Sequence, residues 1–344
     1  MSKILILGGS GLISTPMTQG LIDRGDEVWL FRRGTDDVFS DVPTIHGNRD
    51  NLADKQAAAA KGPFDCVIDM IGFTKQHALD DIAAFSGKTK QLIFCSTFNV
   101  FSQPVPGLPI SNDGPRHPRT SFEYALDKAD MERTFEAAAQ EGAFALTIIR
   151  CSATYQESGL PLPIIGGHGN DAAIPTLTRI LQGKPIVVPG DGTSTWSATF
   201  RDDTASAFVG AAGNEKAYNK AYTLMSETSL TWEEYYRIAA RAWDAPEPTF
   251  VHVSSDLVSA CLPQKTFWLK EAFHYHCYFD ITPAKQDLGY RCKTSWYEGS
   301  LMQKAWHERQ GDIHLQDDPE YEFFVSNYAR LERELIDSCR GLSS

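Results

Sequence analysis

Long apolar runs and an excess of basic charge are both missing from this chain. No run approaches the roughly 18 apolar residues that cross a bilayer, which argues against a membrane span. The 32 Lys and Arg stand against 44 Asp and Glu, so the formal net charge is −12 at pH 7. Because binding to phosphate backbones depends on a basic surface, nucleic acid is not an expected partner.

Paired cysteines are missing as well. The chain has seven cysteines, which are scattered and never form a Cys-x-x-Cys pair. This pattern is typical of free thiols in a reducing compartment rather than of disulfides or a zinc site. Met1-Ser2-Lys3 leads straight into an apolar run, without the pattern of a signal peptide. We therefore expect a soluble, cytoplasmic protein.

What the sequence does have is a regular alternation of apolar runs and helical segments. Such alternation is typical of βαβ units and of a parallel sheet covered on both faces. Strands are predicted at residues 4–7, 27–31, 66–70, 91–95 and 145–149, and a helix at 122–140. The predicted fold class is α/β: a Rossmann-type, doubly wound parallel sheet with a smaller carboxy-terminal α/β substrate domain.

The texture of the chain changes after about residue 155, where Gly- and Pro-rich loops are mixed with short helices. Longer loops of this kind are where substrate is usually shaped and held. We predict a dinucleotide-binding domain over residues 1–155, with a returning segment near 195–215. A substrate domain is predicted over 156–194 and 216–315, and an acidic helical tail over 316–344.

A glycine-rich turn, Gly8-Gly9-Ser10-Gly11, directly follows the first predicted strand. Ile13, Met17 and Leu21 then recur at four-residue spacing, which predicts a helix packed on the sheet. A tight strand-to-helix turn lets backbone amides approach a pyrophosphate, and the positive end of the helix supports its charge. This context predicts a dinucleotide-binding site.

The end of the second strand favours one form of the cofactor. NAD-preferring folds usually place a carboxylate there for the ribose 2′-hydroxyl, whereas this chain has Arg32-Arg33-Gly34. Guanidinium groups attract a 2′-phosphate. We therefore favour NADP, with NAD as the alternative.

Tyr124 and Lys128 are candidates for proton transfer, because a spacing of four residues puts them on one helix face. The ammonium, with an oxidised nicotinamide nearby, is expected to lower the phenol's pKa from about 10 so that it exchanges a proton near neutral pH. Thr97 follows the strand at 91–95, at the carboxyl edge where open α/β sheets bind ligands. Its hydroxyl is expected to orient a substrate oxygen.

These features, in this order, resemble the extended short-chain dehydrogenase/reductase superfamily, and within it the NAD-dependent epimerase/dehydratase family. The resemblance covers roughly residues 3–310. The matching motifs are the glycine turn at 8–13, Gly47-Asn48-Arg49-Asp50, Asp65-Cys66-Val67-Ile68, the segment from Cys95 to Phe101, Tyr124 to Lys128 followed by Glu132, Arg150 to Tyr155, and Phe200-Arg201-Asp202-Asp203.

The resemblance implies a two-domain subunit with cofactor on the amino-terminal sheet, substrate between the domains, and often a dimer. We accordingly expect a homodimer. The residues expected to bind the cofactor are Gly8, Ser10, Gly11, Leu12, Ile13, Arg32, Arg33, Asn48, Arg49, Met70, Ile71, Gly72, Tyr124 and Lys128. Thr97, Tyr124 and Lys128 are the expected catalytic residues.

The sequence also departs from the family pattern. Ser14 replaces a small glycine at which helix and strand pack closely, and Asn48 replaces an adenine-side aspartate. Dehydratases carry an acidic pair after the catalytic threonine, where this chain has Phe98 and Asn99, so dehydration is disfavoured. The family's diphosphate-binding arginine is missing from Thr195-Trp196-Ser197, which weakens a nucleotide-sugar substrate. This region is more similar to a branch that includes the chloroplast stem-loop-binding proteins.

Six residues are candidates for substrate contact: Phe98, Asn99, Tyr155, His168, Trp196 and Arg201. For Trp196, an aromatic face could stack on a sugar ring, although ordinary packing is the competing interpretation. His274 and His276 alternate on one face of a predicted strand, but spacing identifies no third ligand, so no metal site is expected.

The function predicted from these patterns is hydride transfer between a nicotinamide and a secondary alcohol or ketone of a small-molecule substrate, most plausibly a sugar or sugar derivative. The sequence leaves an epimerase and a reductase both open. The alternative hypothesis is a non-catalytic cofactor-sensing or RNA-associated protein that keeps the fold.

Overall fold

The computed structural model describes residues 1–34, 38–119, 121–166, 170–311 and 313–342. The chain divides into two compact units. Unit 1 comprises Met1–Tyr155, Ser197–Glu227 and Tyr278–Thr294, and unit 2 comprises Gln156–Trp196, Thr228–Cys277 and Ser295–Ser344.

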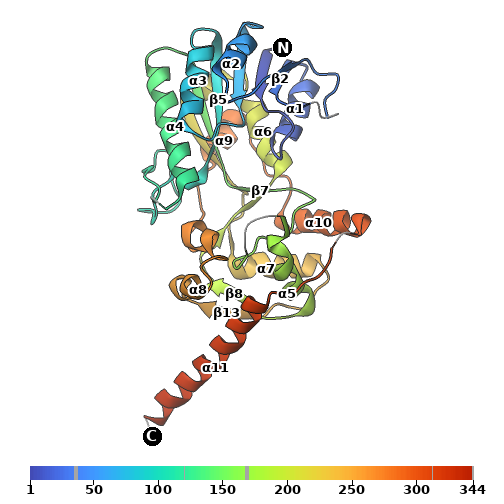
Figure 1. Ribbon diagram of the computed structural model, residues 1–344, viewed down its shortest axis with the longest axis vertical. Helices are drawn as coiled ribbons and strands as arrows, with labels where there is room; N and C mark the ends of the chain where they lie inside the picture. Colours follow the sequence, from blue (N-terminus) through green and yellow to red (C-terminus); the bar gives the residue numbers. More distant parts are fainter. Residues whose placement is uncertain (35–37, 120, 167–169, 312, 343–344) are drawn as a thin grey trace. The chain divides into compact units, whose positions relative to one another are not determined.

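Unit 1 is built on a seven-stranded sheet in the order β11-β6-β5-β4-β1-β2-β3, with all neighbouring strands parallel (Figure 1). The strands are β1 (Lys3–Leu7), β2 (Glu27–Arg32), β3 (Thr44–His46), β4 (Phe64–Asp69), β5 (Thr89–Thr97), β6 (Ala145–Cys151) and β11 (Lys220–Leu224). The strand order reverses between β1 and β4, and at such a switch point open α/β sheets bind ligands beyond the carboxyl ends of their strands.

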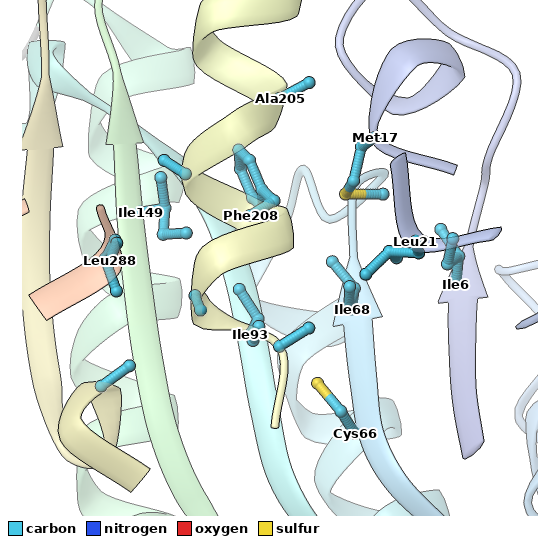
Figure 2. Close-up of a cluster of buried hydrophobic side chains, with 14 of the residues drawn as sticks. Ile6, Met17, Leu21, Cys66, Ile68, Ile93, Ile149, Ala205, Phe208 and Leu288 are labelled. Carbon is cyan, nitrogen blue, oxygen red and sulfur yellow. The ribbon is translucent and has the colours of Figure 1, made fainter. Parts of the chain in front are cut away.

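Helices cover both faces of this sheet, as the sequence pattern predicts. On one face lie α1 (Ser14–Asp23), α6 (Arg201–Ala211) and α9 (Thr282–Leu288); on the other lie α2 (Leu52–Ala59), α3 (Lys75–Phe85) and α4 (Glu123–Gln140). Figure 2 shows how Met17 and Leu21 of α1 and Phe208 of α6 pack with Ile6 and Ile68 of the strands. The fold class is therefore confirmed as a doubly wound, Rossmann-type α/β sheet.

Unit 1 also contains a small parallel pair beyond the main sheet, formed by β7 (Ala153–Tyr155) and β10 (Ala198–Phe200). Two single-turn 3₁₀ segments complete it, η1 (Phe98–Val100) and η3 (Glu215–Ala217).

Unit 2 is smaller and mostly helical. Its helices are α5 (Ile174–Gln182), α7 (Trp232–Ala242), α8 (Ser255–Cys261), α10 (Trp296–Gln310) and α11 (Pro319–Gly341), with the short turns η2 (Asn170–Ala173) and η4 (Leu269–Phe273). Unit 2 also contains two pairs of short strands. In one, β8 (Ile186–Pro189) is parallel to β13 (Phe250–Val253); in the other, β9 (Thr195–Trp196) is antiparallel to β12 (Leu230–Thr231). Within the described ranges, no helix combines the length and the apolarity needed to cross a membrane.

The division of the chain differs from the predicted domains at two places. Residues 216–227 belong to unit 1 rather than to the substrate domain, because β11 pairs with β6 as the edge strand of the main sheet. Residues 278–294 also belong to unit 1, because Ala284 and Leu288 of α9 are buried in the core beneath that sheet. Neither segment has the long apolar run that made the first five strands recognisable.

Candidate active site

The turn after β1 has the backbone conformation that only glycine adopts easily. Gly8 and Gly9 have φ values of +108° and +116°, in the left-handed region. A Cβ at Gly8 would lie 3.2 Å from Cγ2 of Ile71, and one at Gly9 would lie 2.6 Å from Cδ2 of Leu30. The buried Thr18 hydroxyl donates to the Gly9 carbonyl at 3.0 Å and fixes the turn to α1. A side chain at either position would meet the protein's own packing, so the tight turn between β1 and α1 requires glycine here.

The start of α1 explains how the turn accommodates a serine where the family pattern has glycine. The buried Ser14 hydroxyl accepts a hydrogen bond from the Gly11 amide at 2.7 Å. Ser10, Gly11 and Leu12 are exposed ahead of it, and α1 begins at Ser14. The exposed turn therefore stands at the positive end of a helix, where a phosphate is stabilised.

The two arginines after β2 lie in different environments. Arg32 is buried, and its Nη1 donates to the carbonyl of Val38 at 3.1 Å. Arg33 is exposed. Of the pair, only Arg33 is exposed, whereas Arg32 is held against the chain that follows β2.

The adenine-side turn contains a buried charge that the sequence pattern did not reveal. Asn48 is exposed, but the Arg49 side chain is buried and its Nη1 pairs with Oδ1 of Asp69, at the end of β4, at 3.3 Å. Asp81 lies beyond it, 4.0 Å from Arg49 and 2.6 Å from the buried Nζ of Lys55. We call these four residues the Arg49 cluster.

The Arg49 cluster is incompletely hydrogen-bonded. Among the described residues, Nε and Nη2 of Arg49 and one oxygen each of Asp69 and Asp81 have no hydrogen-bond partner. Burial, together with the nearby charge of Asp69, raises the pKa of Asp81 well above its ordinary value. Arg49 was expected to contact the cofactor directly; instead its guanidinium is turned into the protein toward Asp69.

Met70, Ile71 and Gly72 follow β4 and close the turn from the other side. Met70 and Ile71 are half-buried, and the Ile71 amide donates to Oδ1 of Asp69 at 2.9 Å. Gly72 is buried, and a Cβ there would lie 2.2 Å from the second oxygen of Asp69. Asp69 thus organises this loop, with the Gly8 turn directly beside it.

Thr97 and Tyr124 come together at the carboxyl end of β5. Thr97 is the last residue of β5 and Tyr124 lies in the first turn of α4, close enough that the Thr97 hydroxyl lowers the pKa of the phenol in part. The Asn99 amide and its Nδ2 also donate to Oγ1 of Thr97, at 3.3 and 3.2 Å. The Tyr124 side chain is 37% exposed, so it is reachable from outside.

Lys128 lies one helical turn beyond Tyr124 and is 2% exposed. Its Nζ donates to the carbonyl of Cys95 at 2.7 Å and lies 4.7 Å from the ring centre of Phe94 and 5.9 Å from that of Tyr124. Burial lowers the pKa of Lys128, despite the negative charges of Cys95 and Asp69 nearby. The predicted spacing therefore brings the ammonium to the phenol, on the same helix face.

The pKa of Tyr124 is raised in this structure, whereas the sequence analysis expected Lys128 and a bound nicotinamide to lower it. Burial raises the pKa of Tyr124, the charge of Cys95 raises it further, and the Thr97 hydroxyl offsets only part of this. The reason is that the Lys128 ammonium points to the Cys95 carbonyl, not to the phenolic oxygen.

A second buried charge cluster fixes the end of β5 to α4 and β6. Both oxygens of Glu132 accept from Arg150, at 2.9 and 2.8 Å, and one also accepts from Arg116 at 2.6 Å. Ser96, the residue before Thr97, donates to the same carboxylate at 2.5 Å. We call these four residues the Glu132 cluster. It holds Thr97 in place from the opposite face of the sheet.

Two of the predicted substrate contacts are buried in the structure. The Trp196 side chain is 2% exposed, because its ring stacks on Trp232 at 5.2 Å and meets the edge of Phe273 at 4.7 Å. The Phe98 ring is also buried, packed edge-on against Phe279. Ordinary aromatic packing, the competing interpretation, explains both.

The other candidates have different outcomes. Asn99 is half-buried, and its Nδ2 donates to the Thr97 hydroxyl. Tyr155 is half-buried, with its ring centre 5.5 Å from that of Phe200. Arg201 is the first residue of α6, and its Nε lies 3.5 Å from the carboxylate of Asp202. These three remain predictions. His168 lies outside the described residues. Over the described parts of the chain no group of three or more His, Cys, Asp or Glu could hold a metal ion.

Sequence reasoning missed the cysteine pair beside the predicted catalytic residues. Cys95, near the end of β5, and Cys151, at the end of β6, are diagonal neighbours on one face of the sheet, because the register pairs Cys95 with Ile149 and Thr97 with Cys151. The neighbouring Cys151 thiol and the charge of Lys128 lower the pKa of Cys95. Only strand register brings these two residues together, because 55 positions separate them in the sequence.

The doubly wound parallel sheet and the match to a family model identify the chain as an NAD-dependent enzyme of the extended short-chain dehydrogenase/reductase type. More particularly, the chain belongs to the NAD dependent epimerase/dehydratase family, whose model matches residues 4–224.

Individual relatives point in several directions. The chain is 25% identical over 316 residues to the chloroplast stem-loop binding protein of 41 kDa b of Arabidopsis thaliana, covering 86% of this chain and 77% of that protein. It is 25% identical over 247 residues to 2′-dehydrokanamycin reductase of Streptomyces kanamyceticus, covering 71% and 67%. Its fold is similar to the UDP-glucose-4-epimerase of Stenotrophomonas maltophila with bound NAD, with a TM-score of 0.69, 14% identity, and coverage of 91% and 100%.

Proposed function

We propose that this protein transfers hydride between a nicotinamide dinucleotide and a secondary alcohol or ketone of a sugar or sugar derivative. The observation that carries the proposal is the placement of the 37% exposed Tyr124 in the first turn of α4, close to Thr97 at the end of β5, with Lys128 on the next turn of the same helix and its Nζ 5.9 Å from the ring centre of Tyr124. The glycine turn and the exposed start of α1 would hold the pyrophosphate. When bound, the nicotinamide supplies the hydride acceptor or donor.

The roles of the side chains follow from their positions. Tyr124 exchanges a proton with the substrate oxygen, and Thr97 orients that oxygen through its hydroxyl. Lys128 is a buried positive charge within about one helical turn of the phenol, so it favours the phenolate whenever the proton leaves. Glu132 acts through Ser96 and Arg150 as a positioning residue for the end of β5.

Two features favour an epimerase or a reductase over a dehydratase. The positions after Thr97 hold a buried phenylalanine and an asparagine bonded to Thr97, so no carboxyl group stands there to assist loss of water. The 2′-dehydrokanamycin reductase among the relatives supports reduction of a carbonyl group. An epimerase would retain and regenerate its dinucleotide, whereas a reductase would consume it stoichiometrically.

We infer that NADP is the preferred form, on the exposed side chain of Arg33. A homodimer and a cytoplasmic location remain predictions from the sequence.

Replacing Tyr124 by Phe tests the proposal. We expect kcat to fall by about 10²- to 10⁴-fold, because proton transfer is lost, while dinucleotide affinity changes little. The absorbance of the nicotinamide is followed with candidate sugars and ketones, and dinucleotide binding is measured by calorimetry. The matched control is Tyr218→Phe, in the same unit but away from the site. Full turnover in the Tyr124→Phe variant would exclude the proton-transfer role.

Binding of an RNA stem-loop is a second candidate function, because the chain is similar to the chloroplast stem-loop binding protein of Arabidopsis thaliana. The net charge of −12 works against it, because phosphate binding requires a basic surface. A labelled RNA stem-loop titrated at low and moderate salt decides the matter: salt-sensitive binding without any hydride exchange would support this candidate over the enzyme.

A further inference from the structure

Phe73 is an exposed aromatic residue beside the candidate active site. It follows the loop from Met70 to Gly72 and is 48% exposed, although phenylalanine is usually buried. The Lys128 ammonium lies 5.1 Å from the centre of this ring, 4.7 Å from that of the buried Phe94 and 5.9 Å from that of Tyr124. A cation at such a distance over an aromatic face is attracted by the ring. Phe94 therefore contacts the ammonium from the core, and Phe73 covers it from the exposed side.

The loop that leads to Phe73 lies against the glycine turn. A Cβ at Gly8 would lie 3.2 Å from Cγ2 of Ile71 and 3.6 Å from Cβ of Met70. Because the strand order reverses between β1 and β4, this is the edge at which open α/β sheets bind ligands. The exposed ring of Phe73 offers a flat apolar surface at that edge.

A side chain from the start of α3 fixes the backbone of Phe73. Thr74 caps α3, and His77 lies in its first turn. The Phe73 amide donates to Nδ1 of His77 at 3.1 Å. On the other side of the ring, Nε2 of His77 lies 2.8 Å from Oδ1 of Asp50. We call Asp50, His77 and Phe73 the His77 tie, since they join the turn at 47–50 to the loop before α3.

The hydrogen bonds of the His77 tie define the protonation state of the imidazole. A backbone amide can only donate, so Nδ1 must be without a proton in order to accept from Phe73. The proton of the neutral ring is then on Nε2, which donates to the Asp50 carboxylate. A proton added at Nδ1 would set two donors against each other, and the hydrogen bond to Phe73 would be lost.

The charged groups around His77 favour the neutral ring. Arg49 and Lys55 bring positive charge near it, whereas Asp50 and Asp127 bring negative charge. Burial, together with the charges of Arg49 and Lys55, lowers the pKa of His77, and the hydrogen bond to Asp50 opposes this only in part. The ring is therefore neutral at pH 7 and takes up a proton as the pH falls below the ordinary value of 6.5.

We propose that His77 is a positioning residue for the ligand site: its neutral form holds Phe73 over the Lys128 ammonium, and its protonation releases that ring. The exposed face of Phe73 contacts the bound dinucleotide, a step that rests on the proposed function. Dinucleotide affinity therefore falls when His77 becomes charged, and His77 acts only through Phe73.

Nitrogen NMR of the full chain, labelled at the histidine rings and free of ligand, tests the His77 tie. The signal of His77 is identified by its loss in His77→Asn, or by its shift in Asp50→Asn if the first variant does not fold. We expect a proton on Nε2 and none on Nδ1 at pH 8, and protons on both nitrogens in acid. A proton on Nδ1 at pH 8 would overturn the proposal.

Titration calorimetry with NADP⁺ from pH 8 to pH 5 tests the effect on binding. His77→Asn keeps a neutral acceptor near the position of Nδ1, so it should match the wild type at pH 8 and bind about three- to tenfold more tightly than the wild type at pH 5. The ratio of the two affinities cancels any titration of the ligand itself. The matched control is His46→Asn, an exposed histidine of β3, which should follow the wild type at every pH. Equal affinities of the wild type and His77→Asn at pH 5 would overturn the proposal.

Phe73→Leu separates the aromatic ring from the histidine. The variant keeps an apolar side chain but loses the aromatic face, so NADP⁺ affinity at pH 8 should fall about three- to tenfold. The control is Leu79→Ala, at a 44% exposed position of α3, which should leave affinity unchanged.

A histidine that only caps α3 would give a different result. Its replacement would change the midpoint of urea denaturation and leave the pH dependence of NADP⁺ affinity as in the wild type, which contradicts the proposal. If the wild type binds no dinucleotide at any pH, the proposed function fails, while the NMR result still decides whether the His77 tie exists.

Discussion

Unit 1 contains two clusters of buried charge that differ in how completely they are paired. In the Glu132 cluster, both carboxylate oxygens accept hydrogen bonds from arginines and one also accepts from Ser96. In the Arg49 cluster, each carboxylate has an oxygen without a hydrogen-bond partner among the described residues, and Arg49 has two such nitrogens.

The difference bears on how rigidly each cluster is held. Removing one partner from a buried, fully paired cluster leaves an uncompensated charge, which is strongly destabilising. The Glu132 cluster therefore fixes the end of β5 rigidly. The Arg49 cluster borders the loop from Met70 to Gly72, beside the glycine turn, and its charges are less completely paired than those of the Glu132 cluster.

Glu132→Gln is expected to have the largest effect on stability. The amide would leave the buried Arg150 without its anion, and Arg116 with Glu136 alone, so we expect a loss of about 3–5 kcal/mol in the free energy of unfolding. Urea denaturation at neutral pH measures it. The control is Glu136→Gln, one turn further along α4, whose half-buried carboxylate pairs with Arg116 alone and should cost under about 1 kcal/mol. Equal losses in both variants would contradict a special role for Glu132.

The same carboxyl predicts a dependence on pH. Burial tends to raise the pKa of Glu132, but the charge and hydrogen bonds of Arg150, with those of Ser96 and Arg116, hold it below the ordinary 4.5. Its contribution to stability is therefore complete above about pH 4.5 and is lost as the pH falls through the folded-state pKa. The difference in the free energy of unfolding between the wild type and Glu132→Gln should become smaller in acid and stay constant above about pH 5.

Arg49→Met is expected to cost less, about 1–3 kcal/mol. Arg49 makes one long hydrogen bond to Asp69, and the raised pKa of Asp81 means that a proton can neutralise the excess negative charge left behind. Because protonation of Asp81 offsets the loss of the Arg49 charge, the stability lost in Arg49→Met should become smaller as the pH falls and larger as the pH rises. A deficit as large as that of Glu132→Gln, unchanged from pH 5 to 8, would show that the two clusters are equivalent.

Arg33→Ser extends the comparison to an exposed charge and should leave stability within about 0.5 kcal/mol of wild type. If Arg33 meets the 2′-phosphate, NADP⁺ affinity should fall about tenfold, or about 1.4 kcal/mol, while NAD⁺ affinity is unchanged. Titration calorimetry with both dinucleotides measures this. If the affinities for NADP⁺ and NAD⁺ fall equally, or if neither falls, Arg33 has no role in selecting the cofactor.

Local patterns predicted the sheet and the helix that carries Tyr124 and Lys128 well. The apolar runs at 4–7, 27–31, 66–70, 91–95 and 145–149 lie within or overlap strands of the main sheet, and the helix predicted at 122–140 is α4. The spacing of Tyr124 and Lys128 was enough to place both on one face of that helix, because helical periodicity is a property of the chain alone.

Contacts between distant segments could not be predicted in the same way. Trp196 has the composition of a sugar-stacking residue, and only its contacts with Trp232 and Phe273 show that its ring is buried. Arg49 looked like a cofactor ligand until Asp69 and Asp81 were placed beside it. An acidic residue at the end of the apolar run at 64–69 was the one available signal, since a buried aspartate requires a partner.

The sequence by itself determined the Rossmann-type sheet, the glycine turn and the helix that carries Tyr124 and Lys128, because periodicity and backbone freedom are local properties. Only the tertiary structure decided which charges are fully paired, which aromatic rings are buried, and that Cys95 and Cys151 are neighbours on adjacent strands. Those outcomes depend on strand order and register, which bring together residues that no local pattern relates.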